Sequence, residues 1–113
     1  MSEAVRQLAA AGAKVAACHP VQIFNDDLEG TLGRLPGTVW GVTGDPAGKE
    51  VVAALGGRPM DVPESGRVRY HAALVLAANG CAGLAATAAD QLRAGGVIDP
   101  AALLGPLVHA SVD

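Results

Sequence analysis

Residues 70–79 read YHAALVLAAN, and this stretch decides how the rest of the chain is interpreted. It opens a helix that is apolar on every side, yet it begins with Tyr70 and His71 and carries Asn79 two turns later. A helix that is hydrophobic all round has to be covered all round. Because a chain of 113 residues has little else to cover it, the stretch predicts both a polar site and a surface that a partner covers.

The helical pattern extends from about residue 67 to residue 94, where Gly95 and Gly96 end it. Within it, residues 72–89 approach the length of about 18 residues that a membrane span needs. Ala and Gly dominate that run, and Asn79 would lie near the middle of a bilayer. We therefore expect a helix that is covered by protein and no membrane contact.

Three short segments before residue 63 have the composition of strands: 14–18 (KVAAC), 38–43 (TVWGVT) and 58–62 (RPMDV). Residues 25–36 are polar and rich in Gly, which predicts a loop with at most one helical turn. The order predicts an α/β front, residues 1–63, with a small, mostly parallel three-stranded sheet. An all-α back, residues 64–113, follows with one long apolar helix, and we expect both parts to form one compact unit.

Composition and charge exclude several classes of protein. The net charge is −3 and the acidic and basic residues are scattered, whereas a nucleic-acid footprint needs clustered Lys and Arg. Cys18 and Cys81 form no short-spaced pair, and the N-terminus has no signal-peptide pattern. We expect a cytoplasmic protein that does not bind nucleic acid.

The usual catalytic motifs are absent from the sequence. There is no G-x-G-x-x-G turn, P-loop, Gly-x-Ser-x-Gly elbow or His-Glu-x-x-His helix. Residues 41–45 (GVTGD) precede a predicted helix but lack the third glycine of a dinucleotide-binding turn. Zinc-binding residue types occur at Cys18, His19, His71 and Cys81, without the spacing of a zinc site. No cofactor and no metal are expected from these patterns.

Four blocks carry a family resemblance: HPVQIF (19–24), GVTGD (41–45), ALGGRP (54–59) and YHAALVLAAN (70–79). In this order they resemble the Rossmann-like oxidoreductases whose second, uncharacterised domain is similar to the C-terminal domain of phosphogluconate dehydrogenases. The resemblance covers nearly the whole chain. It implies that the first block ends a nucleotide-binding domain, that the last block begins the helix joining a dimer, and that a nicotinamide cofactor is used.

The chain departs from that family at both ends. It begins just before the HPVQIF block, so the glycine-fingerprint half is missing, and it stops at residue 113, before the further helices of the family. We therefore expect a truncated Rossmann-like part followed by a part like the phosphogluconate dehydrogenase C-terminal domain. Such a chain is either a reduced descendant without its own cofactor or a piece that needs a complement to bind NADP.

Five polar residues are candidates for the chemistry. His71 and Asn79 are about 12 Å apart along the helix and lie on nearly one face, where an imidazole can transfer a proton and a carboxamide can hold an oxyanion. His19 follows a predicted strand end and could face His71 as an acid/base partner. His71, His19 and Asn79 are the predicted catalytic residues, and Tyr70 and Gln22 the predicted substrate-binding residues. The competing interpretation is structural: capping, loop hydrogen bonds and helix packing.

Three functions are compatible with this pattern. The favoured one is a cofactor-independent lyase, isomerase or cyclase that uses histidine acid/base chemistry on a small carbonyl-type substrate. The second is an NAD(P)-dependent oxidoreductase part that takes its nucleotide domain from elsewhere, and the third is a non-catalytic dimerisation or ligand-binding module. Under each of them we expect a homodimer through residues 67–94, because pairing two such helices is the simplest way to cover them.

Overall fold

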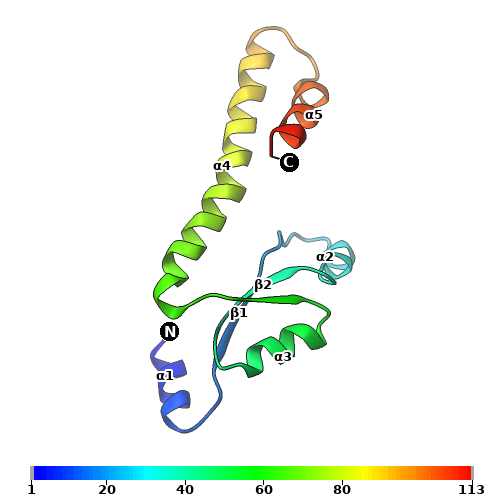
Figure 1. Ribbon diagram of the computed structural model, residues 1–113. Coiled ribbons are helices and arrows are strands. Elements are labelled where there is room, and N and C mark those ends of the chain that lie inside the picture. The colour runs from blue at the N-terminus through cyan, green and yellow to red at the C-terminus, as the bar shows by residue number, and fades with distance from the viewer. Residues whose placement is uncertain (1, 113) are drawn as a thin grey trace. The chain divides into compact units, whose positions relative to one another are not determined.

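The computed structural model describes residues 2–112, and Figure 1 shows the order of its elements. They are α1 (Glu3–Ala10), β1 (Ala16–Pro20), α2 (Leu28–Arg34), β2 (Val39–Gly44), α3 (Ala47–Ala54), β3 (Arg58–Asp61), the 3₁₀ turn η1 (Glu64–Gly66), α4 (Arg67–Ala94) and α5 (Pro100–Val112). The chain divides into two compact units, Met1–Tyr70 and His71–Asp113. The division falls inside α4 and not at residue 63, and each unit is described by itself.

The first unit contains one three-stranded sheet in the order β1-β2-β3. β2 and β3 are parallel, as expected, whereas β1 is antiparallel to β2, so the prediction of a mostly parallel sheet is wrong for this strand. The reason lies in the connection between them, because the Val21 N–H donates to the Val39 carbonyl at 2.9 Å. β2 therefore begins beside the end of β1 and has to run back along it.

Two predicted boundaries also differ from the structure. β1 extends to Pro20, so His19 lies within the strand and not after it. The loop expected at residues 25–36 contains α2, which has seven residues. Asp27 accounts for this helix, because its carboxylate accepts the Gly30 N–H at 2.9 Å and caps the first turn.

Helix α3 covers one face of the sheet. It approaches closely because Gly48 has no side chain: a Cβ there would lie 2.6 Å from the Ala16 Cβ and 3.0 Å from the Val42 Cγ1. Val42 of β2 and Val52 of α3 form the core between the sheet and the helix, with 3% and 0% of their surfaces exposed. Side chains alternate along a strand, so Gly41 and Thr43 belong to the opposite face.

The second unit contains most of α4 and all of α5. Among the described residues, one helical stretch, Glu64–Ala94, is long and apolar enough to cross a membrane by length and composition, with a mean hydropathy of 1.6. None of that apolar window is buried. Leu76 and Leu84 are typical, with 74% and 75% of their surfaces exposed. The prediction of one long apolar helix is confirmed, and within residues 2–112 no residue of α4 is fully buried.

Candidate functional site

The first unit brings two of the predicted residues together. His19 lies in β1 directly opposite Gly41 of β2, and Tyr70 lies in the first turn of α4. The His19 Nδ1 is 3.2 Å from the Tyr70 hydroxyl oxygen. The two rings meet edge to face, with centroids 5.7 Å apart and planes at 88°. A contact between residues 51 positions apart in the chain thus joins the sheet to the start of the helix.

The Tyr70 hydroxyl lies against the backbone of Gly41. Burial raises the pKa of the Tyr70 phenol above its usual value, and a backbone hydrogen bond from Gly41 acts in the opposite direction. Since burial is the larger cause, the phenol keeps its proton at neutral pH. It is therefore a hydroxyl group next to an imidazole, and not a phenolate.

This pair is suited to proton transfer. A tyrosine hydroxyl oxygen can accept the Nδ1–H of a neutral imidazole, whose basic lone pair is then on Nε2, and it can accept the same Nδ1–H from an imidazolium. Tyr70 can thus stay bonded to His19 in both charge states. An imidazole held in this way at Nδ1 exchanges protons with a small molecule through Nε2.

Gln22 has a structural role in addition to its predicted one. Its side-chain Oε1 accepts the backbone N–H of Ile23 at 2.9 Å, and its own N–H donates to the carbonyl of Pro20 at 3.0 Å. These bonds fix the turn that follows β1 and therefore the end of the strand that carries His19. Contact of Gln22 with a substrate stays a prediction.

His71 and Asn79 belong to the second unit, where both lie on α4 and both are exposed. His71 directly follows Tyr70 in the helix, so the two side chains leave the helix axis about 100° apart. Their predicted roles, acid/base catalysis for His71 and binding of a carbonyl oxygen for Asn79, stay predictions.

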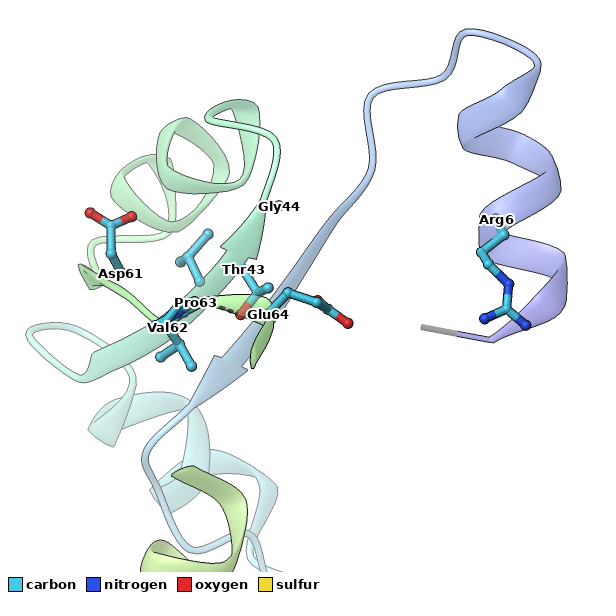
Figure 2. Close-up of a pocket in the computed structure, with 8 residues that line it drawn as sticks. Arg6, Thr43, Gly44, Asp61, Val62, Pro63 and Glu64 are labelled. Carbon is cyan, nitrogen blue, oxygen red and sulfur yellow. Dashed lines mark hydrogen bonds between the residues drawn. The ribbon is translucent and has the colours of Figure 1, made fainter. Parts of the chain in front are cut away.

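A hollow of about 610 Å³ opens at the carboxyl ends of β2 and β3. Open α/β sheets place their ligands at this end of parallel strands. Figure 2 shows Arg6 on one side and Thr43 and Glu64 on the other. The lining residues are Arg6, Val42, Thr43, Gly44, Asp61, Val62, Pro63 and Glu64. Sequence reasoning missed this hollow, although the ends of the segments TVWGVT and RPMDV marked its place.

The hollow is lined in part by β2, the strand that carries the residue opposite His19. Thr43, in its floor, is two residues beyond Gly41 on the same face of β2, a distance of about 7 Å along the strand. The Thr43 hydroxyl donates to the Val62 carbonyl at 2.6 Å and ties the two strand ends together. The hollow thus includes a residue about 7 Å along β2 from the residue opposite His19.

The charges around the hollow are balanced by their neighbours. Arg6 pairs with Glu3 at 2.8 Å, Asp61 pairs with Lys49 at 2.7 Å, and Glu64 pairs with Arg67 at 3.4 Å. Each cation in this set is thus matched by an acid. The hollow consequently has no strong preference for an anion or a cation.

The turn between β2 and α3 does not fit a dinucleotide. A pyrophosphate needs the first amides of a helix, but here the Asp45 carboxylate accepts the Ala47 N–H at 2.8 Å. That negative charge would repel a phosphate placed on the same amides. Over residues 2–112 there is also no group of three or more His, Cys, Asp or Glu side chains arranged to hold a metal ion.

Comparisons with known proteins agree on the fold and leave the activity open. A family model described as "Domain of unknown function (DUF2520)" matches residues 38–113. The crystal structure of protein TM1727 from Thermotoga maritima is similar, with 26% sequence identity and a TM-score of 0.70 over 87% of this chain. The present chain spans 40% of that protein's chain. A comparison with curated proteins found no match.

Proposed function

The chain belongs to the DUF2520 family, and from this premise we propose that it acts on a small molecule by proton transfer through His19, with Tyr70 orienting the imidazole. The family description names no reaction, so support comes from the residues. The observation that carries the proposal is the 3.2 Å contact between His19 Nδ1 and the Tyr70 hydroxyl. A hollow of about 610 Å³ is lined in part by Thr43, which lies about 7 Å along β2 from Gly41, the residue opposite His19.

The proposed substrate is a compound with a carbonyl group, because a carbonyl makes the neighbouring C–H acidic enough for an imidazole base. His19 takes that proton at Nε2, and the electron pair moves onto the carbonyl oxygen. Tyr70 accepts the Nδ1–H of the resulting imidazolium and stabilises its charge. Return of the proton to another carbon gives isomerisation, and its transfer to a departing hydroxyl group gives dehydration.

Two residues of the second unit have proposed roles of their own. Asn79 is proposed to bind a carbonyl oxygen through its carboxamide. His71 is proposed as a second acid/base group beside Tyr70 on the same helix. Both roles follow from their residue types and their positions in α4, and both are tested by the same assay as His19.

Exchange of carbon-bound hydrogen in D₂O tests the first step without knowledge of the full reaction. The full-length chain is incubated with a panel of 2-oxo and 3-oxo acids, and loss of the C–H signals is followed by ¹H NMR. We expect His19→Gln to slow enzyme-dependent exchange by about 100-fold or more. His109→Gln is the matched control, because it replaces the histidine that has no proposed role and should leave exchange unchanged.

Two results would contradict the proposal. One is exchange by the wild-type chain that is no faster than in buffer across the panel. The other is exchange that persists unchanged in both His19→Gln and His71→Gln, which would favour the non-catalytic dimerisation or ligand-binding module.

An NADP-dependent oxidoreductase is the second candidate. It is favoured by the resemblance to Rossmann-like oxidoreductases with a domain similar to that of phosphogluconate dehydrogenases, and by the longer chain of the Thermotoga protein. Since the β2–α3 turn does not fit a dinucleotide, the nucleotide would have to bind residues outside 2–112. Titration of the chain with NADPH, followed by nicotinamide fluorescence and Tm, separates the candidates. Binding by this chain alone would contradict a cofactor-independent enzyme.

We also infer that the protein is a cytoplasmic homodimer paired through residues 67–94. The support is α4 itself, because none of its apolar window is buried within the described residues. A second copy offers the same apolar surface, and a two-fold pairing covers both helices at once. Light scattering in dilute, detergent-free buffer should give twice the chain mass. A monomer, or a chain that stays in solution only with detergent, would contradict the inference.

A further inference from the structure

Gly41 lies in the middle of the central strand and is buried. A Cβ atom at this position would lie 2.5 Å from the Tyr70 hydroxyl oxygen, 2.7 Å from the Tyr70 Cζ and 3.1 Å from the Val62 Cγ2. Real Cβ contacts essentially never fall below 3.0 Å. Gly41 is not among the glycines with a positive φ. The position therefore requires glycine for space and not for backbone conformation.

We infer that Gly41 is a positioning residue for the proton-transfer pair: the missing side chain is the space in which the Tyr70 hydroxyl lies, and this places its oxygen against His19. The inference rests on the proposed function and deepens it, because it says what holds the two groups in register. His19 is paired directly with Gly41, and side chains of directly paired residues share one face of the sheet. Tyr70 thus lies where the Gly41 side chain would otherwise stand beside His19.

The contact is sensitive to displacement. The distance between a Cβ at position 41 and the Tyr70 hydroxyl oxygen would have to grow from 2.5 Å to an ordinary contact of about 3.5 Å. The phenol therefore has to move by about 1 Å. The His19–Tyr70 distance is 3.2 Å, near the upper limit for a hydrogen bond. Even alanine at position 41 should therefore break the pair.

The chain is well suited to a direct test, because it contains one tyrosine and three histidines. Ultraviolet titration reports on Tyr70 alone, and ¹⁵N NMR of the imidazoles, assigned with His71→Gln and His109→Gln, reports the tautomer and hydrogen bonding of His19. In Gly41→Ala we expect the phenol pKa to fall toward about 10, because the ring loses its burial. The Nδ1 signal of His19 should move as it does in Tyr70→Phe. Gly33→Ala is the matched control, since a Cβ there meets nothing within 4 Å.

A double-variant cycle tells positioning from a general effect on the sheet. If Gly41 acts through Tyr70, Gly41→Ala should cause no further change of the His19 signal in the Tyr70→Ala background, which lacks the ring. A Gly41→Ala protein whose tyrosine titration and His19 signal match those of the wild type would overturn the inference. So would an additive change in the double variant.

The inference can still be tested if the Gly41→Ala protein fails to fold. The variant Gly41→Ala/Tyr70→Ala removes the ring that the new methyl group meets, so it should restore the wild-type far-ultraviolet circular dichroism. A double variant that stays unfolded would overturn the inference. None of these measurements needs turnover, so Gly41 can fail as a positioning residue while the hydrogen-exchange assay still supports proton transfer by His19.

Discussion

The two units bury apolar surface in different ways. In the first unit, α3 packs on the sheet through a glycine, and the valines between them are almost fully enclosed. In the second unit, α4 has no buried residue and α5 has one, Pro100. The first unit therefore contains a small core of its own. The second unit contains a helix that is as apolar as a core helix but is not buried. A helix that is apolar on all sides is stable in water when another surface covers it, and the proposed dimer would supply that surface.

A charge in the first unit's core should have the largest effect. Val52→Asp places a carboxylate at a position with 0% exposure, where the loss of its hydration is costly. We expect a loss of about 4 kcal/mol or more in the free energy of unfolding. That is most of the stability of a small domain, so the sheet should unfold. Circular dichroism and urea titration measure the result.

The adjacent residue supplies the control for that substitution. Val51 is on the same helix but is 56% exposed, so Val51→Asp should change the free energy of unfolding by less than about 0.5 kcal/mol. Equal destabilisation by both variants would show that α3 does not enclose a core, and the contrast between the two units would fail.

Charges on α4 should instead change association. Leu76→Glu/Leu84→Glu adds two carboxylates to a surface that is exposed in one chain and covered in the proposed dimer. We expect the dimer dissociation constant to rise by about 100-fold or more, because each charge would be desolvated without a partner. Sedimentation or light scattering over a dilution series measures it, with Val51→Glu as a control at an exposed position outside residues 67–94. A wild-type dissociation constant would place the interface elsewhere.

The same substitution in both units gives a smaller and sharper comparison. Thr43→Val removes a buried hydroxyl that donates to the Val62 carbonyl at 2.6 Å, which should cost about 1–2 kcal/mol and lower Tm by about 4–8 °C for each kcal/mol. Thr87→Val removes an exposed hydroxyl that donates to the Gly83 carbonyl at 3.0 Å. It should change the free energy of unfolding by less than about 0.5 kcal/mol. Thermal unfolding of the two variants decides whether burial makes the difference.

The sequence predicted the helices of the second unit better than the sheet of the first. Residues 67–94 were expected to be helical, and α4 has these bounds, because a long run of good helix formers closed by two glycines is a local signal. The direction of β1 was predicted wrongly, since a short apolar strand reads the same in either direction. Its direction depends on where β2 begins, and that is fixed by a hydrogen bond between Val21 and Val39.

The candidate site was predicted in its residues but not in its arrangement. His19 and Tyr70 were both expected to take part, yet their contact depends on how the start of α4 lies on the sheet, and no spacing in the sequence records that. The space at Gly41 was hidden for the same reason, because a glycine within a strand has many causes. The hollow at the strand ends was missed because its residues come from segments 6, 42–44 and 61–64, which meet only in three dimensions.

The smallest expected effect concerns pH and the Tyr70 phenol. Its pKa is raised in the folded chain by burial, so between the unfolded value, about 10, and the folded value the native state holds more of the proton than the unfolded state does. The free energy of unfolding should therefore fall as pH rises through this window, and the contribution of Tyr70 is complete below it. Tyr70→Phe has no such proton, so the fall between pH 9 and pH 11 should be smaller in the variant. Urea titrations of both proteins at each pH measure the difference, and an equal fall in both would show that the phenol is not held against β2 in solution.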